Sequence, residues 1–517
     1  MKSRASLFSL TSSLALFAAA CSGGGTSIAP PPPNNGFTTS NLSGQYAFSM
    51  SGSENTANGI EPLTRVGVFI ADGNGNITGG AEDITIFGTL TEELDFTGGT
   101  YTVSSDGRGT LTLNNSTGSL LLSIVLTSPS AGYIVPFPTD ASESASGSFI
   151  KQAAGPFSLA NVNGSYAFDF SGSDPSAFSE SFVGQIAANG GGSFTTGLVD
   201  DNDAGTINGG VAGPALISGT YASDPLHTSD FSSFGRCVVN ISGVVGVLYV
   251  VGPNQFKFME TSSGGTLTGD AFLQSNIPTS TAQLSGGFVY VMGGSGSGAP
   301  ITRGGKISLA NGATSSAVVD SNNAGQLLSL TGNAGTYTID GAGSGRGTIT
   351  FAAQGQTNPF QYVFYMVSPS QIFIQDQSLN IVEDGSMLAQ GTSTISNASL
   401  AGNYGINWSG VTEAQQVIGE EDLIGEATIG SSGALTGTID LNEFTVLEQF
   451  TAVPLTGTLT LNSDPTSHNS MTVNLATNPA NNGLTLFAYV ANNNTILLMG
   501  TQKNVRITAG VMTPQNP

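Results

Sequence analysis

One short pattern occurs four times along this chain, at intervals as long as a whole domain. In each copy a glycine is followed two residues later by an aromatic residue; the glycines are Gly44, Gly164, Gly286 and Gly402. Their separations are 120, 122 and 116 residues. Solenoid repeats are much shorter, roughly 20–50 residues. The sequence therefore predicts four tandem units, each large enough to hold its own core.

Each repeat also ends alike, with a glycine five residues before a glutamine, and these glutamines are Gln152, Gln274, Gln390 and Gln515. The start and end signals predict β-barrel repeats at residues 41–152, 160–274, 282–390 and 398–517. Because the linkers between them are short, as at residues 153–161, we expect neighbouring units to sit like beads with limited contact.

Apolar and polar residues alternate in the opening segment of each repeat, which is the period-two pattern of a β-strand. In repeat one, Tyr46, Phe48 and Met50 fall on one face, and Gln45 and Ser49 fall on the other. This alternation predicts one buried face and one solvated face.

Repeat one contains eight such segments, near residues 43–50, 65–71, 76–84, 99–104, 108–114, 120–127, 131–136 and 147–152. An even number of strands lets a meander bring its last strand beside its first and remove both edges. The sequence predicts an all-β fold of four tandem antiparallel up-and-down eight-stranded β-barrels, with two-sheet β-sandwiches as the alternative. Long connections at 52–64 and 85–98 predict one loop-rich end and one tight end.

Recurrent aromatic and basic residues are candidates for closing the tight end of each barrel. The aromatic residues are Tyr46, Tyr166, Phe288 and Tyr404, and the basic residues are Arg108, Arg236, Arg346 and His468. A guanidinium above a ring face gains about 0.5–2 kcal/mol from cation–π attraction. We therefore expect a structural closing role for them, with anion binding by the arginines as the alternative.

The opening Gly-x-aromatic pattern, with one closed and one open end, resembles the calycin group, which comprises lipocalins and avidins. The resemblance covers the architecture of each whole repeat, and tyrosine or phenylalanine stands where those families usually have tryptophan. It implies barrels that enclose side chains or one small ligand. Because the inward residues Tyr46, Phe48 and Met50 are large, a packed lumen is favoured over a hollow one.

Acidic and amide residues recur at the end of the third strand, near the predicted loop-rich end. They are Asp83, Asp200, Asn202, Asp320, Asn322, Asp440 and Asn442. Such side chains often cap turns by accepting hydrogen bonds from nearby backbone N–H groups. They are nevertheless the only candidate ligand-binding residues in the sequence.

The N-terminus has the layout of an export signal. Lys2 and Arg4 precede an apolar run that ends in small residues directly before Cys21, so residues 1–20 are predicted to be a signal peptide. The run resembles a bacterial lipobox, which implies lipid attachment to Cys21 and an outer-membrane lipoprotein, periplasmic or surface-exposed. Ordinary cleavage after residue 20 and secretion is the alternative, and metabolic labelling with a fatty acid separates the two. Residues 21–40, rich in Gly and Pro, are predicted to form a tether.

The composition argues against catalysis and nucleic-acid binding. The sequence has two histidines, His227 and His468, in non-equivalent places of different repeats, so it offers no repeated triad and no histidine-based metal site. A net charge of −23 repels phosphate backbones and anionic membranes. We expect no cofactor and no metal, and membrane contact through the N-terminal lipid only.

Together these features predict a non-catalytic cell-surface lipoprotein whose repeated β domains bind an extracellular ligand or partner, or serve structural display. A carrier of a small apolar ligand is the alternative, and a secreted hydrolase is the third possibility.

Overall fold

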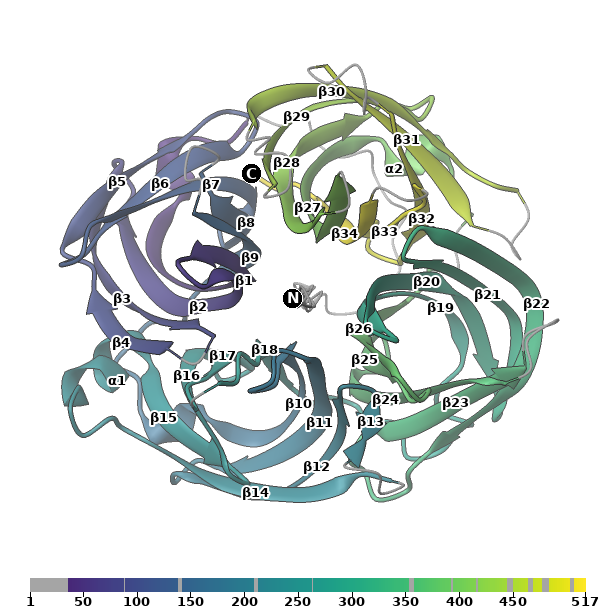
Figure 1. Ribbon diagram of the computed structural model, residues 1–517, viewed down its shortest axis with the longest axis horizontal. Coiled ribbons are helices and arrows are strands. Elements are labelled where there is room, and N and C mark those ends of the chain that lie inside the picture. The colour runs from purple at the N-terminus through teal and green to yellow at the C-terminus, as the bar shows by residue number, and fades with distance from the viewer. Residues whose placement is uncertain are drawn as a thin grey trace, which may run out of the picture.

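Each repeat forms its own closed antiparallel β-barrel of eight strands in the computed structural model (Figure 1). The structure describes residues 36–517 except 88, 138–141, 209–212, 263, 353–357, 392–393, 415–416, 444–449, 464–467, 477–482 and 503–505. The first strand of every repeat pairs with its last strand. The prediction of four tandem barrels is therefore confirmed, and the sandwich alternative is wrong. The predicted signal peptide, Cys21 and most of the tether lie outside the described residues.

The first two barrels each carry one additional strand beside the eight that close. Barrel 1 consists of η1 (Thr39–Asn41), β1 (Ser43–Thr56), β2 (Gly59–Asp72), β3 (Asn76–Ile86), β4 (Thr89–Asp95), β5 (Gly98–Val103), β6 (Arg108–Asn114), β7 (Ser119–Ser128), β8 (Ala131–Pro136) and β9 (Glu143–Lys151). Barrel 2 consists of η2 (Leu159–Asn161), β10 (Asn163–Ser173), β11 (Ser179–Asn189), β12 (Ser193–Asp203), β13 (Thr206–Ile207), β14 (Ala215–Ala222), α1 (Thr228–Phe234), β15 (Arg236–Ile241), β16 (Val244–Gly252), β17 (Gln255–Glu260) and β18 (Thr268–Leu273). The additional strands, β4 and β13, pair with β3 and β12.

Barrels 3 and 4 close with eight strands each. Barrel 3 consists of β19 (Gly286–Gly296), β20 (Ala299–Ala310), β21 (Ala313–Asn323), β22 (Gln326–Ile339), β23 (Arg346–Ala352), β24 (Phe360–Ser368), β25 (Gln371–Asp376) and β26 (Ile381–Ala389). Barrel 4 consists of α2 (Asn397–Leu400), β27 (Gly402–Ala414), β28 (Val417–Ile429), β29 (Ala434–Glu443), β30 (Phe450–Thr460), β31 (Asn469–Leu475), β32 (Gly483–Val490), β33 (Ile496–Gly500) and β34 (Arg506–Pro514). None of the helices described has the length and apolar character needed to span a bilayer.

The two long loops predicted for repeat one are largely strand. Residues 52–64 continue β1 and β2 into one hairpin, which pairs residue for residue up to Thr56 and Gly59. Residues 85–98 contain β4. Their Ser, Gly and Glu residues indicated turns, but pairing with a neighbouring strand satisfies the same backbone groups. The prediction of loops at these positions is wrong.

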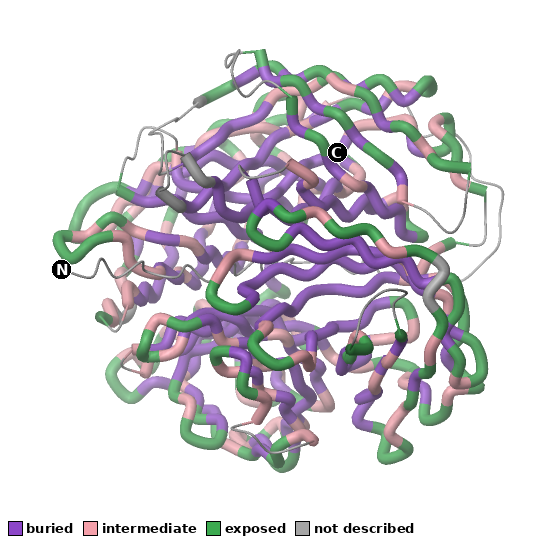
Figure 2. Tube along the Cα trace, turned by 45° about the vertical axis from the view of Figure 1, so that its right-hand side comes forward, coloured by how far each residue is buried: buried purple, intermediate pink, exposed green. Residues whose placement is uncertain are grey.

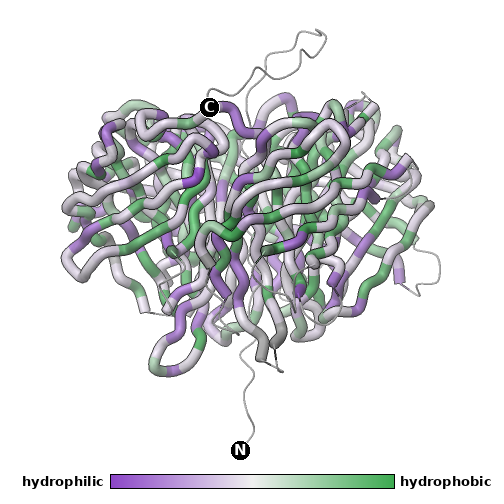
Figure 3. Tube along the Cα trace, turned by 90° about the horizontal axis from the view of Figure 1, so that it is seen from above, coloured by the Kyte–Doolittle hydropathy of each residue, from purple (hydrophilic) through white to green (hydrophobic). Residues whose placement is uncertain are grey.

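The inward face of the strands follows the predicted alternation, but the outward face is not uniformly solvated. Tyr46, Phe48 and Met50 lie in the core of barrel 1. The outward Ser49 and Ser51 are also buried, at 3% and 4% exposure. Hydrophobic and hydrophilic segments are interspersed along the strands nearest the viewer (Figure 3). The outward face of β1 is shielded from water because the neighbouring barrels pack against it.

The four barrels form a closed ring in which their first and last strands face the centre (Figure 1). Apolar clusters join neighbouring barrels, with Val68 against Tyr249 between barrels 1 and 2, and Val183 against Tyr365 between barrels 2 and 3. Another cluster joins barrels 1, 3 and 4 through residues that include Tyr133. Buried chain continues from one barrel into the next (Figure 2). The expected beads with limited contact are therefore wrong, because the outward strand faces are apolar enough to pack.

The recurrent glutamine at the end of each repeat holds the next barrel. Gln152 and Gln274 each donate through Nε2 to two backbone carbonyls of the following barrel, at 2.6–2.8 Å. Gln390 donates to one, in barrel 4. Gln515 donates to the carbonyls of Asp106 and Leu126 in barrel 1, both at 2.9 Å. The last glutamine thereby closes the ring without a covalent link.

Candidate ligand-binding site

Asp83, predicted as a possible ligand contact, instead joins two barrels. From β3 it accepts hydrogen bonds from Nε and Nη2 of Arg236 in barrel 2, both at 2.8 Å. The Tyr249 hydroxyl donates to the same carboxylate at 2.7 Å. The side chains of Asp83 and Arg236 are 0% and 1% exposed, so the ion pair is shielded from water.

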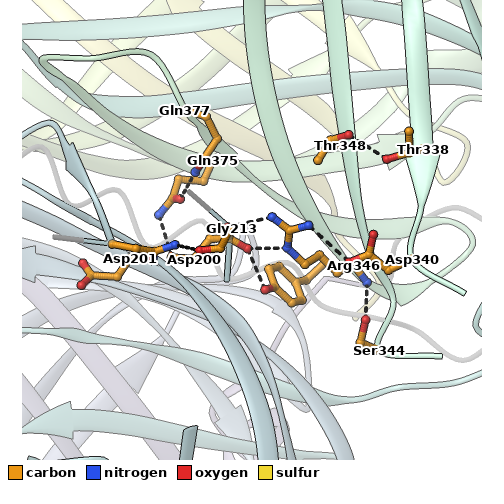
Figure 4. A network of polar contacts seen from close by, with 12 residues as sticks. Asp200, Asp201, Gly213, Thr338, Asp340, Ser344, Arg346, Thr348, Gln375 and Gln377 are labelled. Carbon is orange, nitrogen blue, oxygen red and sulfur yellow. Dashed lines mark hydrogen bonds and ion pairs between the residues drawn. The ribbon is translucent and has the colours of Figure 1, made fainter. Parts of the chain in front are cut away.

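The same arrangement recurs at the next two interfaces. Asp200 accepts from Arg346 at 2.7 and 2.9 Å (Figure 4), and from the Tyr365 hydroxyl at 2.7 Å. At the third interface a histidine replaces the arginine: Nδ1 of His468 lies 2.9 Å from Asp320. The Tyr489 hydroxyl donates to Asp320 at 2.7 Å.

The interface between barrels 4 and 1 departs from this pattern. Asp440 accepts a hydrogen bond from the backbone N–H of Ala452 in its own barrel. Arg108 pairs with Asp106 at 3.1 Å, also within its own barrel. Val125 occupies the position of the missing tyrosine, because it pairs with Arg108 as Tyr249 pairs with Arg236.

The predicted asparagines also join barrels. Asn202 donates to the carbonyls of Asp376 and Ile381 in barrel 3, at 3.1 and 2.7 Å. The other two do the same in the following barrel, with Asn322 donating to the carbonyl of Gly500 and Asn442 to that of Glu143. With the exception of Asp440, these aspartates and asparagines are buried against the following barrel, so they act as docking residues of the third strand rather than as ligand contacts.

The recurrent aromatic residues and the recurrent basic residues make different contacts. The hydroxyls of Tyr46 and Tyr166 donate to the carbonyls of Pro129 and Pro253 across the tight end, and that of Tyr404 donates to Leu400. Phe288 lacks a hydroxyl and packs in its core. The arginine–ring contacts predicted for closure are wrong, because the described cation–π contacts involve Lys151 and Arg303 instead. A buried carboxylate attracts a guanidinium more strongly than a ring does, because it offers two acceptor oxygens and an opposite charge.

Sequence reasoning missed the interface tyrosines. Tyr249, Tyr365 and Tyr489 recur at separations of 116 and 124 residues. This recurrence was the available signal, and the change to Val125 in repeat one would have marked the distinct interface.

A further set of arginines, also missed, lies inside three of the barrels. The groups are Arg65 with Glu82 and Glu143, Arg303 with Asp376 and Glu383, and Arg506 with Glu421 and Glu443. Strand register places these side chains on the same inward face as the core residues. Each arginine side chain is at most 11% exposed. A buried network of one cation and two carboxylates thus lies in the lumen of barrels 1, 3 and 4, beside the apolar core.

Barrel 2 has no such arginine. Arg65 and Arg303 each pair with the residue six positions after the opening glycine, and in barrel 2 the residue at that pairing position is Phe182. The arginine and the lysine of barrel 2 both face other barrels: Arg236 binds Asp83, and Lys257 donates to Ser49 of barrel 1. The described lumen of barrel 2 therefore holds no basic side chain.

Barrel 2 instead contains a cavity of about 240 Å³ that Phe182 lines. The space inside barrel 4 is about 10 Å³. Leu216, which is 85% exposed, also lines the cavity, so the cavity reaches the surface. The expectation of a packed lumen is therefore wrong for barrel 2.

Stacked phenylalanines form one wall of this cavity. The ring centroids of Phe168 and Phe170 lie 4.6 Å apart, and those of Phe170 and Phe258 lie 4.4 Å apart. Such rings offer apolar surface, and their faces carry negative partial charge.

Carboxyl groups lie beside this wall. Asp201 lines the cavity directly. Glu180 lies two positions before the inward-facing Phe182, and Asp203 and Glu260 lie two positions after Asp201 and Phe258. All three therefore share the inward face of their strands. Burial and the neighbouring Asp201 raise the pKa of Glu180 to about 9, and burial and Asp203 raise that of Asp201 to about 6.

The site can therefore hold a small molecule with an apolar body and a polar end. Preformed apolar cavities with a few convergent polar groups are the usual form of small-ligand sites. Among the described residues, no three His, Cys, Asp or Glu side chains are arranged to hold a metal ion.

Comparisons with known proteins give no family. No family model matches the chain, and no curated protein matches it. Among solved structures, a mutant of the vaccine antigen transferrin-binding protein B from Haemophilus parasuis Hp5 has 11% identity and a TM-score of 0.17, over 69% of this chain and 76% of that one. A double mutant of the same antigen gives 9% identity and a TM-score of 0.18, over 94% and 98%. A Nitrosomonas europaea protein described as AttH has 9% identity and a TM-score of 0.14, over 71% of this chain and 100% of that one. The resemblance is one of architecture alone.

Proposed function

We propose that this chain is a non-catalytic binding protein of the cell surface, in which the lumen of barrel 2 takes up a small, largely apolar ligand. The observation that carries the proposal is the contrast between the cavity of about 240 Å³ in barrel 2 and the space of about 10 Å³ in barrel 4. Folded proteins pack their interiors densely, so a cavity of this size in barrel 2, beside a nearly filled lumen in barrel 4, is the feature that a bound ligand would explain.

In this proposal the ring is a rigid support for the binding barrel. Barrels 1 and 3 flank barrel 2 and fix it through the buried ion pairs of Asp83 and Asp200. Lipid on Cys21 and the tether at residues 21–40 would hold the ring away from the membrane. Neither histidine lines the cavity, which supports binding rather than hydrolysis.

Uptake of a small apolar probe such as toluene, followed by ligand-observed NMR, tests the proposal. We expect saturable binding to the purified chain and its loss in Val199→Trp, because the indole would fill the cavity that Val199 lines. Thr196→Phe is the matched control, since it adds an aromatic ring at an exposed position of the same strand.

Two results would contradict the proposal. One is the absence of toluene binding to the unaltered chain, together with no retained ligand in native mass spectrometry. The other is binding that Val199→Trp leaves unchanged, since the probe would then occupy a different place.

A further inference from the structure

Barrel 2 keeps the acidic end of the other lumens but lacks their cation. Glu260 in β17 stands at the position of Asp376 in β25, because the two strands pair in the same register with the last strands of their barrels. Asp376 binds Arg303. Glu260 has no arginine to bind, because Phe182 occupies the place of Arg303.

The carboxyl groups at this end carry unused acceptor atoms. The Oδ1 atoms of Asp201 and Asp203 are buried and accept no hydrogen bond from any described residue. Glu260 accepts from Ser262 and from the backbone N–H of Leu267. A buried acceptor without a donor destabilises the folded state, and a ligand with hydrogen-bond donors or a positive charge would offset this penalty.

The cavity below these groups favours an organic cation over a bare ion. Its wall includes the stacked rings of Phe168, Phe170 and Phe258, which can bury the apolar body of a ligand while the carboxyl groups attract its positive charge. A hydrated metal ion would gain nothing from these rings.

We infer that the ligand of barrel 2 is a small organic cation, an ammonium group on an apolar body, which places its charge among Glu180, Asp201, Asp203 and Glu260 where the other barrels have arginine. This inference rests on the proposed function and specifies the charge of its ligand.

The surrounding groups make the binding depend on pH. Burial raises the pKa of Glu180, Asp201, Asp203 and Glu260, and Asp174 adds to the effect on Glu180 and Asp203. No basic side chain of the described lumen opposes these shifts. A bound cation favours the ionised carboxyls, so binding releases protons and weakens as the pH falls from about 8 to about 5.

The test compares phenyltrimethylammonium with tert-butylbenzene, which has the same shape and no charge. At about pH 8 we expect the cation to bind about tenfold more tightly, the difference that 1.4 kcal/mol of charge attraction produces. Phe182→Arg, which restores the lumen arginine, should abolish this preference. Phe182→Leu, the matched control, should keep it, and the conservative Asp201→Asn should reduce it.

The outcomes separate the two proposals. Equal binding of both probes, or tighter binding of tert-butylbenzene, overturns the cationic ligand and leaves the apolar site in place. Binding of neither probe, together with no uptake of toluene, overturns the proposed function itself. Displacement of the cation by equimolar Ca²⁺ would show a metal site and would also overturn the inference. Proton release measured in buffers of different ionisation enthalpy should accompany binding of the cation only.

Discussion

At the scale of single residues, the aspartate at the end of the third strand contributes differently to the free energy of unfolding in different barrels. Asp200 binds Arg346 and Tyr365 of the next barrel, whereas Asp440 accepts one backbone N–H of its own barrel. Removing one partner of a buried ion pair leaves the other charge uncompensated. We therefore expect Asp200→Ala to lower the free energy of unfolding by about 3 kcal/mol, and Asp440→Ala by about 1 kcal/mol. Urea unfolding of both variants measures the difference, and equal losses would contradict the docking role of Asp200.

At the scale of elements, β28 carries acidic residues into the interface that closes the ring. Burial and the nearby Asp106 raise the pKa of Glu426 to about 7, with Arg108 opposing them. Because the folded state holds this proton more tightly than the unfolded chain, the contribution is full below about pH 4.5 and is lost as the pH rises through about 7. We expect the urea midpoint to fall between about pH 5 and about pH 8, and to fall less in Glu426→Gln. An identical slope in the variant would show that Glu426 titrates normally.

At the scale of the whole molecule, the two ends of the ring meet without a covalent link. A Cβ on Gly107 would lie 2.7 Å from Nε2 of Gln515 and 2.9 Å from Cδ2 of Phe37, so both ends of the described chain reach the same turn. A permutant that joins residue 517 to residue 36 through a short Gly/Ser linker, and begins in the segment between barrels 2 and 3, should therefore fold to the same ring. Circular dichroism and toluene binding equal to those of the natural order would support this. Aggregation of the permutant, with a control permutant opened inside β12 as reference, would contradict it.

The sequence by itself determined the number of repeats and their β-strands, because side-chain direction in a strand alternates locally and the repeat is visible in the chain. It favoured closed barrels, but only the pairing of the strands excluded two-sheet sandwiches. The partners of Asp83 and Asn202 were decided only by the tertiary structure, since they belong to barrels more than a hundred residues away. The same holds for the hollow barrel. Arg65, Phe182 and Arg303 lie 21, 18 and 17 residues after their opening glycines, so hairpins of unequal length hide their equivalence. Only the strand register brings them to one position and shows where a cation is missing.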